Sequence, residues 1–134
     1  KVMHKCGCLP LDRENNREAL KTVKAATEYI DKDYASVVIY PEGTRSKSGE
    51  LLPWHAGSLK IAQKANVPIV ICSLVNSRAI LRNMFRKHTE VWLDVLDVIP
   101  AEELAGKTTI EVGERVHAVM EAGVVRREQA QGLR

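Results

Sequence analysis

Aromatic residues, cysteines and long hydrophobic runs are all scarce in this sequence. Only 4% of the 134 residues are aromatic, so we expect a core of Val, Ile, Leu and Ala, which favours a parallel or mixed α/β sheet. The three cysteines include Cys6 and Cys8, which lie too close together to suggest a disulfide framework. No run approaches the ~20 apolar residues of a membrane-spanning helix, and no secretory signal is visible. Membrane contact, if any, is expected to be peripheral or to involve sequence outside these residues.

The net charge is too small to indicate a nucleic-acid-binding protein. Twenty basic and 17 acidic residues leave a formal charge of +3, whereas non-specific DNA binding needs many phosphate contacts on one face. The length of 134 residues fits one domain with its own core. The chain opens on Lys1 rather than Met and reads like the middle of a domain, so we expect a fragment of a longer protein.

Hydrophobic patterning alternates between strands and helices along the chain. Strands are predicted at "SVVIY" (36–40), "PIVICSLV" (68–75) and "TEVWLDVLDVI" (89–99), with a shorter one in "CGCLPLDR" (6–13). The run at 36–40 is continuous and β-branched, which predicts a strand covered on both faces. The strand-loop-helix-strand order of residues 36–75 favours a right-handed parallel crossover. The sequence therefore predicts an α/β layered sandwich with a mostly parallel or mixed central sheet flanked by helices.

Helical periodicity appears in four stretches. The first begins at Asn15 or Asn16 as N-cap and carries one apolar face, composed of Leu20, Val23, Thr27 and Ile30. A second begins near Ala56 or Ser58, and residues 77–88 predict three further turns. The last follows Thr108 or Thr109, turns Val112, Val116, Val119 and Met120 inward, and ends at Gly123. These bounds predict a domain of residues 1–123 and a frayed polar tail of residues 124–134.

The loop that follows residues 36–40 is the strongest candidate for an anion site. In open α/β sheets ligands bind at the carboxyl ends of strands, where this loop is predicted to lie. Arg45 offers a planar fork of donors for a phosphate or carboxylate, Thr44 adds a hydroxyl, and Gly43 permits positive φ. Glu42 would repel a phosphate, so we expect it to accept backbone N–H bonds or to pair with an arginine. A surface turn with an incidental salt bridge is the alternative.

The same loop carries a family resemblance. "YPEGTRS" (40–46) resembles the E-G-T-R block of the glycerolipid acyltransferases, specifically the 1-acyl-glycerol-3-phosphate acyltransferases. "CGCLPLDR" is similar to the family's G-x-x-(F/V/I)-x-D-R block, "GELLPWHAGSLKIAQKANVPIV" to its connecting stretch, and "NVPIVICSLVNS" to its V-P-I-(V/I)-P block. These blocks stand in the family's order across residues 6–77. One departure lies in the last block. The family's second proline would fall near Ile71 or Cys72, and this chain has no proline there.

The resemblance implies an enzyme of phospholipid synthesis. It implies transfer of a fatty acyl group from acyl-CoA or acyl-carrier protein, as co-substrate and without a cofactor, to 1-acyl-glycerol-3-phosphate, giving phosphatidic acid. The substrate-binding residues that it implies are Arg13, Glu42, Gly43, Thr44, Arg45 and Ser46. Arg45 and Arg13 would hold the acceptor's phosphate. Lipid substrates further imply work at the cytoplasmic face of a membrane.

The catalytic base of that reaction is missing from this chain. A histidine oriented by a carboxylate suits the task, and the family carries the pair as H-x-x-x-x-D. The residues five positions after His4, His55, His88 and His117 are Leu9, Lys60, Leu93 and Ala122. We therefore predict no catalytic residue in these 134 residues and no acyl transfer by them alone. An upstream H-x-x-x-x-D pair in a longer gene product would indicate an enzyme, and its absence the alternative, a non-catalytic phosphate- or lipid-binding module at a membrane surface.

Two other clusters of residues allow a functional and a structural interpretation. His4, Cys6 and Cys8 would share one face of a strand and could meet a zinc ion, but no fourth ligand is evident, so we predict buried cysteines and no metal. Cys72 is likewise predicted to be a small core residue, on the strand at 68–75.

Residues 78–88 form the second of these clusters. Ile80, Leu81, Met84 and Phe85 would share one helical face and Arg78 and Arg82 another. This layout is typical of a basic helix on an anionic membrane, and we predict peripheral membrane contact there. A helix packed on the core with solvated arginines is the alternative.

Overall fold

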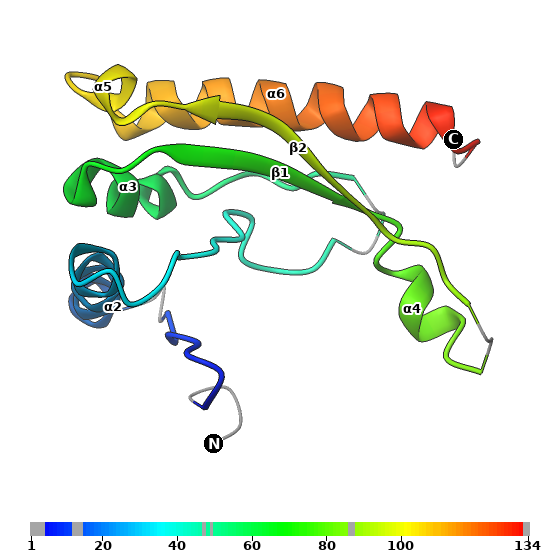
Figure 1. The fold of residues 1–134 in the computed structure, drawn as a ribbon, viewed down its shortest axis with the longest axis horizontal. Coiled ribbons are helices and arrows are strands. Elements are labelled where there is room, and N and C mark those ends of the chain that lie inside the picture. Colours follow the sequence, from blue (N-terminus) through cyan, green and yellow to red (C-terminus); the bar gives the residue numbers. More distant parts are fainter. Residues whose placement is uncertain (1–4, 12–14, 47, 49, 86–87, 133–134) are drawn as a thin grey trace. The chain divides into compact units, whose positions relative to one another are not determined.

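The computed structural model describes residues 5–11, 15–46, 48, 50–85 and 88–132 (Figure 1). The chain divides into two compact units, Lys1–Val67 and Pro68–Arg134, and each is described by itself. The first unit is helical and the second combines helices with a two-stranded sheet. The described residues therefore belong to the α/β class, as predicted. Arg13, His4 and the D-R pair of the predicted upstream block lie outside them.

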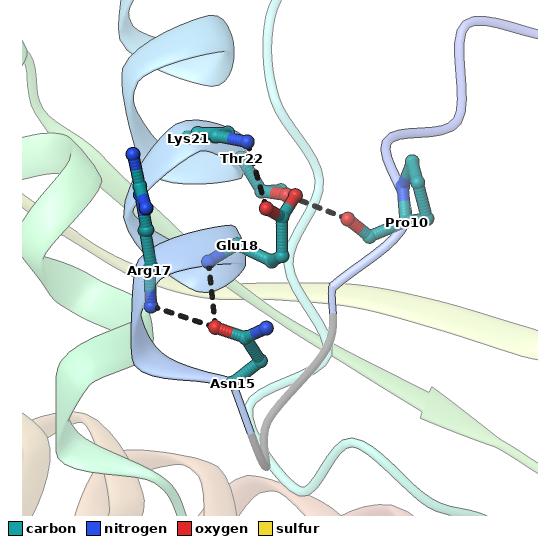
Figure 2. Close-up of polar contacts among 6 residues, drawn as sticks. All are labelled: Pro10, Asn15, Arg17, Glu18, Lys21 and Thr22. Carbon is teal, nitrogen blue, oxygen red and sulfur yellow. Dashed lines mark hydrogen bonds and ion pairs between the residues drawn. The ribbon is translucent and has the colours of Figure 1, made fainter.

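Helix α2 (Asn16–Asp31) is the longest element of the first unit. Its start is confirmed, because the Asn15 side chain accepts hydrogen bonds from the backbone N–H groups of Arg17 at 3.1 Å and Glu18 at 3.3 Å (Figure 2). Ala26 is its buried residue, at 1% exposure, on the side that packs against α3. The prediction that Leu20 faces inward is wrong: this side chain is 61% exposed.

A 3₁₀ turn, η1 (Ala56–Leu59), leads directly into helix α3 (Lys60–Ala65). The predicted start near Ala56 is thereby confirmed, and Leu59 and Ile61 supply the buried side chains. The helix ends at Asn66, whose φ of 51° lies in the left-handed region that asparagine tolerates better than most residues.

Two predicted strands of the first unit are absent from the described residues. Residues 36–40 form no strand, and Val38 and Tyr40 are exposed, so the prediction of a strand covered on both faces is wrong. A strand requires a neighbouring backbone to pair with, and the sheet of the described residues contains β1 and β2 alone. In the upstream segment Cys6 lies in a turn, and both Cys6 and Cys8 are exposed rather than buried in a strand.

Strands β1 (Ile69–Val75) and β2 (Trp92–Ile99) form an antiparallel pair in the second unit. Both strands were predicted, but the parallel crossover was not found: β1 pairs with the strand that follows it, and residues 36–40 supply no partner. A bulge interrupts the register, since Ile71 faces Asp97 while Cys72 faces Val95. Leu96 is therefore the extra residue of β2, which explains why alternation in this strand is mixed.

Helix α6 (Thr109–Ala130) packs along β1 and β2 (Figure 1). A capping box fixes its start, because Thr108 accepts from the Glu111 N–H at 3.2 Å while Glu111 accepts from the Thr108 N–H at 2.7 Å. The predicted end at Gly123 is wrong, since the helix continues to Ala130 and residues 124–130 are not a frayed tail. Gly123 is instead a buried packing position.

The inner face of the sheet and α6 together form the core of the second unit. Its most buried side chains come from both strands and the helix, namely Ile71, Val75, Ile99, Val112 and Val116. A short helix, α5 (Ala101–Leu104), adds the buried side chain of Leu104 between β2 and α6. The outer face of the sheet is also apolar but exposed, and it carries Val70, Leu74, Leu93, Val95 and Val98. Cys72 shares this outer face and is half-buried, so it is not the core residue that was predicted.

The connection between β1 and β2 contains only one turn of regular helix, α4 (Ala79–Arg82). Three helical turns were predicted for residues 77–88, and residues 86–87 lie outside the description. Ala79 is the buried residue of α4. A short helix results because the large apolar side chains of this stretch find no core to pack against, and tertiary packing rather than propensity stabilises most helices in proteins.

Two glycines of α6 form a matched pair for testing this packing. A Cβ at Gly113 would meet nothing within 4 Å, whereas a Cβ at Gly123 would lie 2.4 Å from Leu96 Cδ1. We expect Gly113→Ala to stabilise the chain by ~0.5–1 kcal/mol through helix propensity. Gly123→Ala gains the same propensity, but overpacking costs ~1–3 kcal/mol, so we expect no gain or a net loss.

Urea unfolding of the two variants measures this difference. Leu96→Ala provides the control, because it removes the clashing atoms and should make Gly123→Ala as favourable as Gly113→Ala. Equal stabilisation by both glycine substitutions in the parent chain would show that α6 does not approach β2 closely at Gly123.

Candidate functional site

The candidate site is the loop that runs from Pro41 to His55 in the first unit. The Gly43 N–H donates to the Tyr40 carbonyl at 3.0 Å, which closes a four-residue turn with proline in its second position. Gly43 has a φ of 63°, a conformation that a residue with a Cβ adopts only with strain. The His55 N–H donates to the Pro41 carbonyl at 3.1 Å and joins the two ends of the loop. These two backbone hydrogen bonds thus hold the points where the loop leaves and returns.

The predicted site residues follow one another along this turn. Thr44 and Arg45 are exposed, while Glu42, Gly43 and Ser46 are half-buried. The Ser46 hydroxyl lies 3.2 Å from the Ser48 hydroxyl, which also accepts from the Glu50 N–H at 3.2 Å. The far side of the loop is therefore held by a small hydroxyl network, and the Arg45 guanidinium projects where a ligand can reach it.

The predicted bracing role of Glu42 stays a prediction, because the arginine at position 13 lies outside the described residues. Among the described residues neither Glu42 nor Arg45 makes an ion pair or a side-chain hydrogen bond. The incidental salt bridge of the alternative interpretation is equally missing there. With no carboxylate partner in the described part of the chain, the exposed Arg45 guanidinium offers its N–H donors to an anionic ligand.

The segment that precedes Arg13 is tied to α2. The Thr22 hydroxyl donates to the Pro10 carbonyl at 2.6 Å (Figure 2). On the same helix Lys21 and Glu18 form an exposed ion pair at 2.7 Å. The Thr22 contact fixes the backbone at Pro10, and Arg13, the second predicted phosphate ligand, lies outside the described residues.

Sequence reasoning missed an ion pair in the second unit. Arg127 of α6 donates through Nε to Asp94 Oδ2 at 2.6 Å and through a second nitrogen to Asp94 Oδ1. Arg115, on the same helix, pairs with Glu103 and lies 3.8 Å from Asp97. The available signal was an acidic residue at the inward positions of an apolar strand, because such a carboxylate requires a cationic partner. Both pairs join α6 to neighbouring elements, so we assign them to structure.

These contacts shift the ionisation of their members. Hydrogen bonds from Arg127 lower the pKa of Asp94, and the same bonds raise the pKa of Arg127. The backbone and hydroxyl of Thr108 lower the pKa of Glu111 in the capping box. All of these shifts favour the charged form, which is typical of structural pairs and unlike a base that must accept a proton near neutrality.

Among residues 5–11, 15–46, 48, 50–85 and 88–132, no three His, Cys, Asp or Glu side chains gather as a metal site. No helix in the described part of the chain is both long and apolar enough to cross a membrane.

The sequence that contains the loop matches a family of known proteins. The family model described as Acyltransferase matches residues 1–75, more than half of the chain. The chain belongs to the acyltransferase family. The matched residues include the candidate loop, helices α2 and α3, and the whole of β1.

Curated relatives in this family share a name. A 1-acyl-sn-glycerol-3-phosphate acyltransferase of Haemophilus influenzae is 30% identical over 117 residues, covering 86% of this chain and 48% of the relative. The beta form from Homo sapiens is 29% identical over 121 residues, covering 89% and 44%. One from Cocos nucifera is 42% identical over 60 residues, covering 45% and 20%. The chain thus spans at most about half the length of these relatives, and no solved structure matches it.

We predict that the Asp94–Arg127 pair makes stability depend on pH at the acidic end. The ordinary pKa of Asp94 is 3.8 and the folded state lowers it. The contribution is therefore complete above that value and is lost as the pH falls through the folded pKa. Asp94→Asn should lower the melting temperature at pH 7. The difference in melting temperature between this variant and the parent should shrink as the pH falls below 3.8.

Thermal unfolding of both proteins across this pH range is the measurement. Glu114→Gln is the matched control, since Glu114 is an exposed carboxylate of the same helix. A difference between Asp94→Asn and the parent that stays constant down to the lowest pH would contradict the predicted link to carboxylate ionisation.

Proposed function

We propose that this chain is the acceptor-binding portion of a 1-acyl-sn-glycerol-3-phosphate acyltransferase. The complete protein would transfer a fatty acyl group from acyl-CoA or acyl-carrier protein to 1-acyl-glycerol-3-phosphate and yield phosphatidic acid. The observation that carries the proposal is the "EGTR" turn of an acyltransferase-family chain, on which Arg45 is exposed and has no ion-pair partner among the described residues. The names of the curated relatives support the choice of acceptor.

The acceptor's phosphate would be held by the loop. The Arg45 guanidinium donates two parallel N–H bonds to phosphate oxygens, a geometry that lysine lacks. Thr44 and Ser46 add hydroxyl donors, and the positive φ of Gly43 allows the backbone to approach the ligand. Arg13 is proposed as a second phosphate ligand. Glu42, which carries a charge of the wrong sign for phosphate, would face the glycerol portion, where a carboxylate can accept a hydroxyl hydrogen bond.

The chemical step needs a base that these 134 residues do not supply. The acceptor's hydroxyl oxygen attacks the thioester carbonyl, its proton passes to the base, and the donor's thiol leaves as the new ester forms. We propose that the base is a histidine–carboxylate pair located elsewhere in the complete protein, because no histidine here is followed five residues later by an aspartate. The phosphate site would hold the attacking hydroxyl in position for this step.

We also propose the finer fold and location that the sequence indicates. In the complete protein the domain would form a layered sandwich with a mostly parallel or mixed central sheet. The exposed apolar outer face of β1 and β2 supports this, since such a face is normally covered by a second layer. Substrates with fatty acyl chains support peripheral work at the cytoplasmic face of a membrane.

The competing function is a phosphate- or lipid-binding module without catalysis. The exposed Arg45 turn serves this role equally well, because binding requires no base. The two functions differ in one respect: an enzyme forms phosphatidic acid, whereas a module binds the acceptor and releases it unchanged.

Replacing Arg45 tests the phosphate assignment. Arg45→Ala should weaken binding of a short-chain 1-acyl-glycerol-3-phosphate by about 10- to 100-fold, the usual effect of losing a charge-assisted hydrogen bond. Arg45→Lys keeps the positive charge but loses the planar fork of donors. Its affinity for the acceptor should lie between those of the parent and of Arg45→Ala. Calorimetric titration gives the affinities, and Arg126→Ala, which removes an exposed arginine of α6, is the control for lost charge. Equal affinity of the Arg45→Ala variant and the parent would remove Arg45 from the site.

Acyl transfer separates the enzyme from the binding module. We expect the 134 residues alone to bind the acceptor but to form no phosphatidic acid from acyl-CoA, because the base is missing. The complete gene product should form it, and should lose that activity in the Arg45→Ala variant at low acceptor concentration. Turnover by the 134 residues alone would contradict the account of the missing base, and a complete product that binds without turnover would favour the module.

A further inference from the structure

The connection between β1 and β2 exposes its large apolar side chains. Within and just after α4, Ile80 is 52% exposed, Leu81 74%, Met84 66% and Phe85 96%. Only the small Ala79 turns inward, at 3% exposure. A surface helix normally buries its large apolar residues and exposes polar ones. The arrangement here is the reverse, so the core-packed alternative for this stretch does not hold.

The β1–β2 connection, whose exposed part (Ile80, Leu81, Met84 and Phe85 with Arg78 and Arg82) we call the tip, is held in place at its base. The Asn76 side chain donates to the Glu90 carbonyl at 2.9 Å and so bridges the two ends of the connection. The Asn83 N–H donates to the Ala79 carbonyl at 2.8 Å and closes the helical turn. The turn therefore extends beyond the end of the two-stranded sheet, as Figure 1 shows, on an anchored connection.

Basic residues accompany the apolar tip. Arg78 and Arg82 are exposed, and in the described residues neither forms an ion pair. Glu90 is the only acidic residue between positions 76 and 91, and it lies 3.6 Å from His88. No carboxylate of the connection is therefore positioned to neutralise the arginines, and the surface combines apolar insertion with positive charge.

This combination fits a lipid surface better than a protein partner. A stable protein interface buries about 800 Å² on each side with complementary shape, whereas one helical turn offers a few protruding side chains. A lipid interface accepts protruding Leu, Met and Phe side chains without shape complementarity and attracts arginines through anionic headgroups.

We propose that this tip, formed by Ile80, Leu81, Met84 and Phe85 with Arg78 and Arg82, inserts into the interface of an anionic membrane. The proposal deepens the proposed function and rests on it for the lipid nature of the substrates. It adds a membrane-docking element that is distinct in sequence from the phosphate-binding loop. In this element the apolar side chains insert into the membrane, and the arginines select anionic lipids.

Vesicle binding by the 134-residue chain tests the tip. We expect it to bind vesicles of phosphatidylcholine and phosphatidylglycerol in equal parts more tightly than vesicles of phosphatidylcholine alone. The double variant Leu81→Ser/Phe85→Ser should lower binding to both by at least about tenfold. Arg78→Glu/Arg82→Glu should abolish the preference for anionic vesicles.

The controls use exposed residues away from the tip. The start of α6 lies at the other end of the sheet (Figure 1), and its second residue, Ile110, is 61% exposed. Lys107 is an exposed basic residue just before α6 and so lies at that end too. Ile110→Ser and Lys107→Glu should bind vesicles as the parent does. Insertion itself is measured with Phe85→Trp and brominated lipid, which quenches tryptophan fluorescence. The parent chain already contains Trp54 and Trp92, and we expect Phe85→Trp to show more quenching than the parent. The control variant Ile110→Trp should show no more quenching than the parent.

Three results would overturn the proposal. The first is that the parent chain does not bind vesicles, which is the result expected if this surface binds a protein partner. The second is that the tip variants and the control variants lose vesicle binding equally. The third is that Phe85→Trp shows no added quenching by brominated lipid. Binding of glycerol 3-phosphate without vesicles depends on Arg45 and not on the tip. The tip variants should therefore keep it, so failure of the membrane proposal remains distinguishable from failure of the proposed function.

Discussion

Two backbone hydrogen bonds hold the loop that carries Arg45, the residue proposed to bind the phosphate. The Gly43–Tyr40 bond closes the turn and the His55–Pro41 bond closes the loop around it. Neither depends on the side chains of residues 44–46, and Arg45 has no ion-pair partner in the described part of the chain. This separation matters for binding, because an arginine already paired with a carboxylate must lose that partner before it can hold a phosphate.

The arginines of the chain fall into two groups, those with an acidic partner and those without one among the described residues. In the second unit Arg127 and Arg115 have acidic partners and hold α6 against the elements beside it. Arg45 in the first unit and Arg78 and Arg82 in the β1–β2 connection have no such partner among the described residues. A cation left without a partner contributes little to the fold, and these are the positions at which anionic lipid groups are proposed to bind.

Local signals explain what the sequence could predict. Asn15 and Thr108 cap helices through contacts within three residues, and both starts were predicted correctly. Gly123 misled the prediction because glycine often ends a helix, whereas here it allows contact with Leu96, 27 positions away in sequence. Residues 36–40 have a strand's composition but no partner, and residues 77–88 have a helix's periodicity but no core. The Asp94–Arg127 and His55–Pro41 contacts join distant residues, which no local pattern shows.

The central claim is that the Arg45 turn recognises phosphate, and side-chain NMR tests it most directly. The chain, labelled with ¹⁵N at arginine and glycine, would be titrated with glycerol 3-phosphate and, separately, with glycerol. The account predicts that glycerol 3-phosphate shifts the Arg45 Nε–H and Gly43 backbone signals and leaves those of Arg126 and Gly113 unchanged, while glycerol shifts none of them. Shifts confined to other arginines, or equal shifts with both ligands, would contradict it.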